Sequence, residues 1–469
     1  ALRANTTGAS NIAIGKNTLV TNTTGASNTA VGALAGDAIT TGSYNNAFGY
    51  GALGATTTGE QNLSLGRLSL EDNTTGTLNV AVGNHSLGNN TSASYNTAVG
   101  HQSLYTNITG NALSALGFEA LKLNTGSNNS AVGFKALATN SSGGTNTAMG
   151  DRALFSNTTA SSNTAVGYQA GYANTTGIRL TAIGYQAGKA HVATGTVQNV
   201  FVGNEAGLGN TTGVTNTFIG GSAGAANTTG ANNVAVGTNS LGANTTASYN
   251  TAIGMQSLSA NTTGALNTAV GYQALEDATT ASYNTAVGTQ ALNKNTTGAE
   301  NSAFGEATLF TNTTGANNTA YGRAALFYNT TASNNTAVGY QSLMDNTTGA
   351  QNTAVGRLAL ANNTTAGENV AMGSAALLTN TTGTACTALG SSALYSNTTA
   401  SNNTAVGANA LSENTTGSVN TAVGVDALRL NTTGPHNTAV GYKSLDINTT
   451  GTLNTALGSN ALLLNTTGD

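Results

Sequence analysis

The chain has 469 residues, of which only 6% are charged, and its formal net charge is −4. This balance gives no basic patch of the kind that binds nucleic acid, and no apolar run approaches the roughly 20 residues of a membrane-spanning helix. The single cysteine, Cys386, excludes a framework of intrachain disulfides. We therefore expect no nucleic-acid partner, no membrane span and no cofactor.

A glycine recurs along the whole chain at an almost constant interval of 17 residues. The sequence around each one is close to N-T-A-V-G-x-x-A-L-x-x-N-T-T-G-x-x, and a fixed period of this length indicates one structural unit repeated. We predict one continuous repeat array over residues 1–469, with local irregularities at 117–133 and 184–203, where the interval is 16 and 19 residues. The 27 register glycines include Gly15, Gly32, Gly49, Gly100, Gly339, Gly356, Gly407 and Gly424.

Each repeat is numbered here so that the register glycine is position 5. Positions 1–4, usually N-T-A-V, predict a short strand that ends in a turn at the glycine. Positions 8 and 9, usually Ala-Leu, predict a second short strand, and N-T-T-G at positions 12–15 predicts a turn. The predicted fold is all-β: a parallel β-solenoid (β-roll) of about 27 coils with 17 residues and two short strands per coil.

In-register stacking places identical side chains above one another, about 4.8 Å apart. We expect the Asn residues of positions 1 and 12 to form two amide ladders, as Asn does in stacked β-structures. Thr at positions 2 and 13 is expected to form hydroxyl ladders in the same way. These ladders would fix the register of the coils, which flat repetitive strands otherwise specify weakly.

Every charged side chain lies at position 6, 7, 10, 11, 16 or 17, so we expect these positions to face water. Charges in adjacent coils are expected to pair, namely Asp426 with Lys443, Arg429 with Asp446 and Glu119 with Lys135. Neighbouring residues of a strand point to opposite faces. We favour positions 4 and 9 in the interior, with the small residues of positions 3 and 8 on a face that contacts identical chains; the inverse assignment stays open.

The repeat changes between residues 167 and 224. Glycine replaces the usual Leu of position 9 at Gly171, Gly188, Gly207 and Gly224, and Phe201 and Phe218 replace the usual Ala of position 3. One interpretation, which we favour, is a local repacking in which Phe fills the space of the missing Leu. The other is a bend or binding region formed by Lys189, His191, Phe201 and Phe218.

The repeats resemble those of a known group of proteins. N-T-A-V-G-Y-Q-S-L at 335–343, followed by N-T-T-G at 346–349, is similar to the head repeats of trimeric autotransporter adhesins and to repeats of phage and viral tail fibres. The resemblance implies a left-handed parallel β-roll, three chains around one axis and a place on a cell or virion surface. The adhesin heads usually have a shorter unit than this one.

Residues with catalytic or metal-binding chemistry are scattered. The four histidines lie in different coils at different positions and form no metal-ligand set, so we expect no enzyme. The N-T-T turns are formal acceptors for N-linked glycans, for example at Asn346, Asn380, Asn414 and Asn431. Turn chemistry alone explains these residues, and we favour that interpretation.

Uniform repetition without a special site favours a structural fibre shaft, extracellular or on a virion, in which identical chains associate as a trimer or a larger filament. The alternative is an adhesin head that binds host glycan or matrix. An ice-binding solenoid is less favoured, because the Thr residues do not form T-x-T pairs on one strand. Both chain ends fall within a repeat, so we also expect a piece of something longer.

Overall fold

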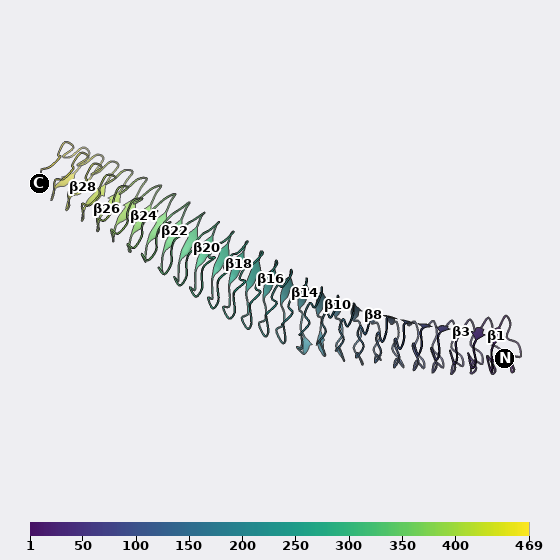
Figure 1. The fold of residues 1–469 in the computed structure, drawn as a ribbon. Coiled ribbons are helices and arrows are strands. Elements are labelled where there is room, and N and C mark those ends of the chain that lie inside the picture. Colours follow the sequence, from purple (N-terminus) through teal and green to yellow (C-terminus); the bar gives the residue numbers. More distant parts are fainter. Residues whose placement is uncertain (469) are drawn as a thin grey trace. The chain divides into compact units, whose positions relative to one another are not determined.

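The structure, a computed structural model, describes residues 1–468, and the chain divides into two compact units. Unit 1 comprises residues 1–233, and unit 2 begins at Val234. Each unit is described by itself. Within each, a three-residue strand stacks on the same strand of the next coil, and turns connect them (Figure 1). The described residues contain no helix.

The strands of the main sheet carry the residues of positions 2–4 and recur every 17 residues except at the two irregular intervals, whereas the two-residue strands β11 and β13 lie outside these positions. Those of unit 1 are β1 (Ile12–Ile14), β2 (Thr29–Val31), β3 (Asn46–Phe48), β4 (Leu63–Leu65), β5 (Val80–Val82), β6 (Thr97–Val99), β7 (Ser114–Leu116), β8 (Ser130–Val132), β9 (Thr147–Met149), β10 (Thr164–Val166), β11 (Gly177–Ile178), β12 (Thr181–Ile183), β13 (Gly195–Thr196), β14 (Val200–Val202) and β15 (Thr217–Ile219). Those of unit 2 are β16 (Val234–Val236), β17 (Thr251–Ile253), β18 (Thr268–Val270), β19 (Thr285–Val287), β20 (Ser302–Phe304), β21 (Thr319–Tyr321), β22 (Thr336–Val338), β23 (Thr353–Val355), β24 (Val370–Met372), β25 (Thr387–Leu389), β26 (Thr404–Val406), β27 (Thr421–Val423), β28 (Thr438–Val440) and β29 (Thr455–Leu457).

The strands of each unit pair in parallel and in register, which confirms the predicted β-solenoid. Both irregular intervals keep this register, because the missing and the extra residues fall in turns. Ser114 of β7 still pairs with Ser130 of β8, and Thr181 of β12 still pairs with Val200 of β14. The longer turn before Val200 carries β13, which forms a separate two-stranded pair with β11. Neither irregular interval therefore interrupts the sheet.

The prediction of a second strand at positions 8 and 9 is wrong. These residues lie in a continuous turn after the register glycine. In the coil of Gly339, the residues at positions 7, 9 and 17 all have positive φ: 52° at Gln341, 52° at Leu343 and 61° at Gln351. An extended strand cannot contain such residues. Each coil therefore has one strand, and its remaining residues are turns held by their neighbours in the stack.

The preferred assignment of strand faces is also wrong for positions 3 and 4. Ala337 at position 3 is fully buried, as are Ser342 at position 8 and Leu343 at position 9, whereas Val338 at position 4 is exposed. The same pattern recurs through both units. The interior of such a coil already contains one Leu and two Asn side chains. Only small side chains such as Ala and Ser fit in the remaining space. The inverse orientation of the strand is the correct one.

The Asn ladder of position 12 is confirmed. In unit 2, Nδ2 of Asn346 donates to Oδ1 of Asn329 at 2.9 Å and to the carbonyl of Gly349 at 2.9 Å. Its own Oδ1 accepts from Nδ2 of Asn363 at 2.8 Å. Each Asn thus links three coils and closes the turn of its own coil. Such bonds satisfy amide groups that burial would otherwise leave without water.

The ladders of positions 1 and 13 involve the backbone more than predicted. At position 1, the backbone N–H of Asn352 donates to Oδ1 of Asn335 at 2.9 Å, and Nδ2 of Asn352 donates to the carbonyl of Ala366 at 2.9 Å. At position 13, the hydroxyl of Thr347 donates to the backbone carbonyl of Thr364 at 3.0 Å, not to another hydroxyl. These side-chain-to-backbone bonds add to the backbone–backbone hydrogen bonds that join the coils, such as that from the N–H of Leu343 to the carbonyl of Ala359 at 2.9 Å.

Asn is absent from position 12 in four coils, at Ile39, Thr56, His191 and Ala278, and these form three gaps in the ladder because Ile39 and Thr56 lie in adjacent coils. In the coil before each gap, the buried Oδ1 of the Asn has no hydrogen-bond partner in the structure. These oxygens belong to Asn22, Asn174 and Asn261. Each gap therefore leaves an unsatisfied acceptor on the preceding coil.

Candidate interaction surfaces

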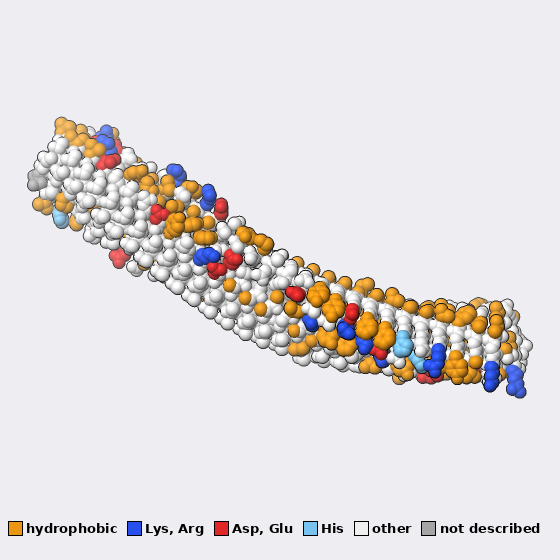
Figure 2. Space-filling view, in the orientation of Figure 1, with side chains coloured by type: hydrophobic (Ala, Val, Ile, Leu, Met, Phe, Trp, Pro, Cys, Tyr) orange, Lys and Arg blue, Asp and Glu red, His pale blue; other side chains and the backbone are white. Residues whose placement is uncertain are grey.

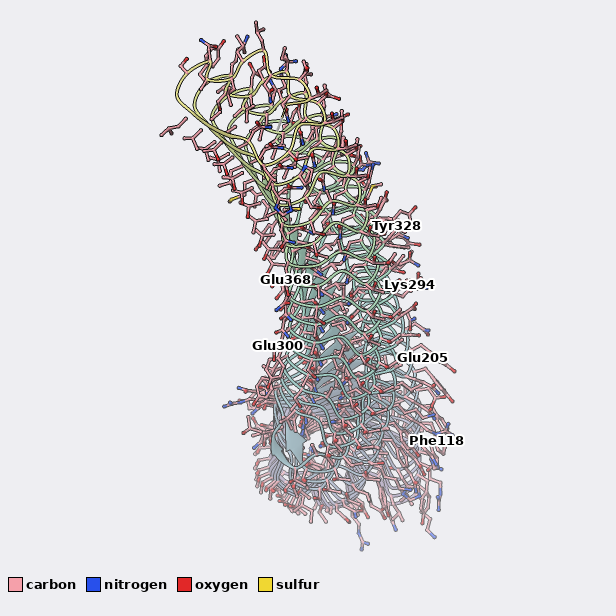
Figure 3. The ribbon with its side chains drawn as sticks, turned by 90° about the vertical axis from the view of Figure 1, so that its left-hand side faces the viewer. Phe118, Glu205, Lys294, Glu300, Tyr328 and Glu368 are labelled. Atoms are coloured by element: carbon pink, nitrogen blue, oxygen red, sulfur yellow. The ribbon has the colours of Figure 1, made fainter. Side chains whose placement is uncertain are left out.

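Charged side chains are few on the surface of either unit, and hydrophobic side chains gather in rows that run from coil to coil (Figure 2). In unit 2, Glu300 and Glu368 at position 17 lie along one edge, and Lys294 and Tyr328 at position 11 lie along the opposite edge (Figure 3). Position 10 was expected to face water, but it is partly covered. The side chain of Asp446 at this position is only 6% exposed.

Two of the three predicted ion pairs form. Nε of Arg429 lies 2.8 Å from Oδ1 of Asp446, and this bond raises the pKa of the guanidinium. Nζ of Lys135 lies 3.3 Å from Glu119, which also accepts a 2.7 Å bond from Lys122. The hydrogen bond from Lys122, followed by that from Lys135, lowers the pKa of Glu119. The cations of these pairs are at least 30% exposed, and partly exposed pairs contribute about 1 kcal/mol or less each.

The third predicted pair, Asp426 with Lys443, is wrong. Asp426 accepts a 3.1 Å hydrogen bond from Nδ2 of Asn409 in the preceding coil. Nζ of Lys443 instead lies 5.4 Å from the ring centroid of Tyr442. An aromatic ring at position 6 thus competes with a carboxylate for the neighbouring cation.

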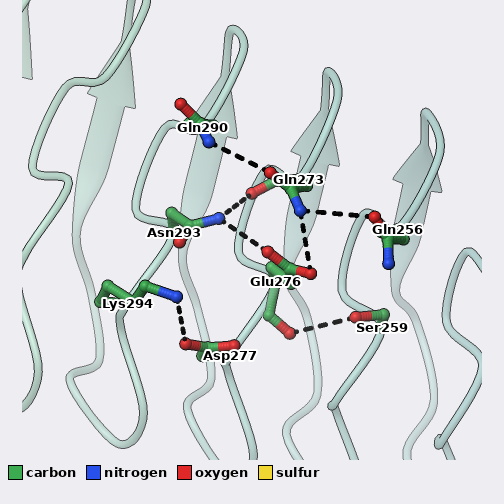
Figure 4. A network of polar contacts seen from close by, with 8 residues as sticks. All are labelled: Gln256, Ser259, Gln273, Glu276, Asp277, Gln290, Asn293 and Lys294. Atoms are coloured by element: carbon green, nitrogen blue, oxygen red, sulfur yellow. Dashed lines mark hydrogen bonds and ion pairs between the residues drawn. The ribbon is translucent and has the colours of Figure 1, made fainter.

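A polar network covers part of position 7 and position 10 in unit 2 (Figure 4). Gln290 donates to Gln273 at 3.1 Å, and Gln273 donates to Gln256 at 3.3 Å, which forms a glutamine ladder over three coils. The carboxylate of Glu276 accepts from Gln273 at 3.2 Å and from the buried amide of Asn293 at 3.0 Å. These amides form hydrogen bonds with one another and with Glu276. The network therefore stabilises the stacking of the coils.

Aromatic rings at position 6 also stack between coils. His101, Phe118 and Phe134 form a continuous stack with ring centroids 5.3 Å apart, and Tyr168 stacks on Tyr185 at 5.4 Å. The interplanar angles of these pairs are 14° or less. Stacking covers the faces of these rings, so mainly their edges face solvent.

The region in which Gly replaces Leu at position 9 has a rearranged interior, which agrees with the repacking favoured from the sequence. Phe201 and Phe218 are fully buried. A Cβ added to Gly207 would lie 2.6 Å from the Phe201 ring, and one added to Gly224 would lie 2.5 Å from the Phe218 ring. Each ring therefore occupies the space that a Leu would need. Phe201, Phe218 and His191 all lie inside the coil, and of the four residues of the predicted binding region only Lys189 reaches the surface.

His191 takes the place of a ladder Asn and is fully buried. Its Nδ1 lies 3.0 Å from Nδ2 of Asn210, and its Nε2 has no hydrogen-bond partner. Because the amide nitrogen can only donate, Nδ1 acts as the acceptor and the ring is neutral with its proton on Nε2. Burial lowers the pKa of His191 to about 4.

We predict that His191→Asn removes an acid-dependent loss of stability. The ordinary pKa of 6.5 applies in the unfolded chain, and that of the folded chain is about 4. As the pH falls from about 6.5 to about 4, the histidine takes up a proton in the unfolded chain but stays neutral in the folded chain. The free energy of unfolding therefore decreases over this range, by up to roughly 3 kcal/mol near pH 4 relative to its value above about pH 6.5. Calorimetric unfolding across this range should show the drop in the original chain and not in His191→Asn. The control His436→Asn, at an exposed position, should keep the drop; an equal pH profile in all three proteins would contradict the prediction.

The predicted glycan acceptors Asn346, Asn380, Asn414 and Asn431 are all fully buried. Each uses Nδ2, the atom that a glycan would occupy, to bond both the preceding Asn and the glycine three residues later. The folded coil therefore has no room for a sugar at these atoms. The favoured interpretation of N-T-T-G as a turn sequence agrees with this geometry.

Cys386 replaces Asn at position 1 and is also buried. Its backbone N–H donates to Oδ1 of Asn369 at 2.9 Å, and its Sγ lies 3.4 Å from the carbonyl of Ala400, so it follows the same bonding pattern as Asn. Burial raises the pKa of the thiol. The residue is a packed substitution in the ladder.

A shallow hollow of about 300 Å³ lies in unit 1 beside Gly51 and Gly54, where two coil positions lack side chains. Asp37, Tyr50 and Glu71 line it. Burial raises the pKa of Asp37. Within residues 1–468, no group of three or more His, Cys, Asp or Glu side chains is placed to hold a metal ion.

The strand face of positions 2 and 4 is a uniform surface that repeats along each unit. Its position 4 side chains are apolar, and none of its residues is charged. The large apolar residues of position 4 that are exposed are Ile14, Leu65, Leu116, Met149, Ile183 and Ile219 in unit 1 and Ile253, Tyr321, Val338, Met372 and Leu457 in unit 2. No other segment of the same unit covers these residues. The open face of the strand thus lies at positions 2 and 4, whereas the side chains of positions 3 and 8, which were predicted to form a contact face, are buried.

Comparison of the chain with protein-family models gives no match, and comparison with curated proteins gives none either. Among residues 1–468, no helix has the length and apolar character needed to cross a membrane.

Proposed function

We propose that the chain is the shaft of a structural fibre in which identical chains pack against one another through the strand face. The uncovered row of apolar side chains at position 4, repeated in coil after coil, supports this proposal. Soluble proteins rarely leave a contiguous apolar surface of this extent exposed without a partner. A second copy of the chain offers the same row at the same spacing.

The size of the strand face is consistent with such an interface. Unit 1 contributes 13 stacked three-residue strands to its main sheet. At about 3.3 Å per residue and about 4.8 Å between strands, this face measures roughly 10 by 60 Å, or about 600 Å². Two such faces in contact bury about 1,200 Å², which is the lower end of the range for specific interfaces. Unit 2 offers a face of similar size.

The resemblance to adhesin heads and tail fibres favours three chains and an extracellular or virion surface, and we propose both. Adhesion to a glycan is compatible with this architecture, because the edges beside the strand face stay open. Ice binding is less supported, because each strand presents one Thr at position 2 beside an apolar residue at position 4.

Sedimentation equilibrium of the full chain tests the fibre proposal. We expect a homo-oligomer, and we expect Val338→Glu to weaken association by tenfold or more, because each copy would bury a charge without a partner. Val338→Thr, which keeps the size of the side chain, should have an intermediate effect. The matched control is Asn362→Glu, at an exposed position 11 where acidic residues occur naturally.

A compact monomer at all concentrations would refute the proposal. Equal association of Val338→Glu and Asn362→Glu would also refute it, because the strand face would then not be the interface. Circular dichroism of each variant shows whether the solenoid is folded, which separates loss of association from loss of structure.

A further inference from the structure

Three consecutive coils of unit 2 carry large exposed side chains at position 17, two residues before the strand. Tyr249 and Tyr283 are each 60% exposed, and Leu266 between them is 46% exposed. All three residues have positive φ, between 60° and 63°. Together they form an aromatic patch, here called the Tyr249–Tyr283 patch.

The spacing of the patch is fixed by backbone bonds between coils. The N–H of Leu266 donates to the carbonyl of Ser248 at 3.3 Å, and the N–H of Tyr283 donates to the carbonyl of Ala265 at 3.1 Å. The two tyrosines are therefore two coil spacings apart, or about 9.6 Å along the stack. A rigid support of this kind lowers the entropy cost of binding.

The two rings of the patch are both largely exposed. Neither Tyr249 nor Tyr283 stacks on another aromatic ring within the described chain, unlike Tyr168 and Tyr185, which cover each other at position 6. Position 16 beside the patch holds only small residues, Ser or Ala. Large exposed rings without a partner are characteristic of recognition surfaces.

The charges near the patch restrict what can bind. None of its three residues is charged, and the next residue of the position 17 row is Glu300, whose N–H bonds to the carbonyl of Ser282 at 3.2 Å. A carboxylate at this end disfavours an anionic ligand. An extended ligand with apolar flat faces and no charge fits best.

We propose that the Tyr249–Tyr283 patch binds a neutral β-1,4-linked polysaccharide of the cellulose and chitin class. In such a chain every second sugar presents the same face, and two sugars extend about as far as two coils of the solenoid. The C–H faces of two sugars stack on the two tyrosines, and Leu266 contacts the sugar between them. This site is separate from the apolar row at position 4, so it does not depend on the fibre proposal.

Retention of the full chain on insoluble cellulose and on chitin tests the site. We expect retention on at least one of them, and we expect Tyr249→Ala/Tyr283→Ala to weaken it by tenfold or more. Each single variant should have a smaller effect. The control Tyr340→Ala/Tyr442→Ala removes two exposed tyrosines of position 6 and should leave retention unchanged.

Several results would overturn the proposal. These are absence of retention on both materials, equal retention of the patch variant and the original chain, or binding of an acidic polysaccharide such as alginate alone. Loss of self-association in the patch variant would show that the tyrosines contact a second copy of the chain instead. Normal sedimentation with lost retention supports the glycan site whatever the outcome of the strand-face experiment.

Discussion

Gly339→Ala is expected to unfold its coil locally, with a cost of at least roughly 3 kcal/mol. The backbone of Gly339 has φ of 135°, a conformation that residues with a Cβ rarely adopt. An added Cβ would also lie 2.5 Å from the carbonyl oxygen of Gly356 in the next coil. Because that oxygen belongs to backbone that is itself hydrogen-bonded in the stack, it cannot move aside without breaking the register.

Hydrogen exchange of backbone amides is the appropriate measurement, since repeat arrays open locally and a single global free energy is not well defined. Protection should fall in the coils of Gly339 and Gly356. Gly458→Ala separates the effect of backbone strain from that of steric overlap, because φ at Gly458 is 119° but no atom lies within 4 Å of an added Cβ. Gly221→Ala, with neither strain nor contact, is the neutral control. Unchanged protection in Gly339→Ala would show that the coils are not held as the structure has them.

The second large effect is expected at the ladder of position 12. Asn346→Ala removes two hydrogen bonds that Asn346 donates and one that it accepts. It leaves the buried Oδ1 of Asn329 and one N–H of Asn363 without partners. We expect a cost of roughly 3 kcal/mol, because lost buried partners cost more than the bonds themselves. Amide protection in the coils of Asn329 and Asn363 reports the change.

The reverse substitution, Ala278→Asn, should stabilise unit 2 by roughly 1 kcal/mol. Ala278 occupies a ladder gap, and the Oδ1 of Asn261 in the preceding coil has no partner. A new Asn would donate to that oxygen and accept from Asn295. Ala408→Asn, at position 6 where Asn also occurs naturally, is the control. The ladder interpretation fails if the two substitutions have the same effect on protection of the neighbouring coils.

Much of the architecture follows from the pattern of the sequence. The 17-residue interval predicts parallel in-register stacking, and in-register stacking makes an Asn at a covered position bond its own copy. The distribution of charged residues indicates correctly that positions 1 and 3 are buried, but position 4, which also carries no charge, is exposed. It fails at position 10, where Asp446 is buried against Arg429. The presence of a charged residue at a given position in the sequence does not show whether side chains of the neighbouring coil cover it.

The candidate sites were less predictable. A glycosylation motif and a lone histidine look accessible in a sequence, but Asn346 and His191 prove to be ladder residues inside the coil. Their 17-residue register was the signal that placed both at position 12. The Tyr249–Tyr283 patch was not anticipated, although the 17-residue spacing of its residues and the charges at position 17 were signals that could have found it.

The sequence by itself determined the repeat, the all-β class, the parallel register and the amide ladder, because each depends only on period and residue type. The tertiary structure decided which strand face is interior and how the turns run. Alternation along a strand places Ala337 and Val338 on opposite faces, but it does not say which face is inside. The width of the coil decides this, since Leu343 and the Asn ladders leave room only for Ala. Positive φ at Leu343 likewise has no signal in its own sequence. Bonds to the neighbouring coils and burial of its side chain stabilise a conformation that leucine alone would rarely adopt.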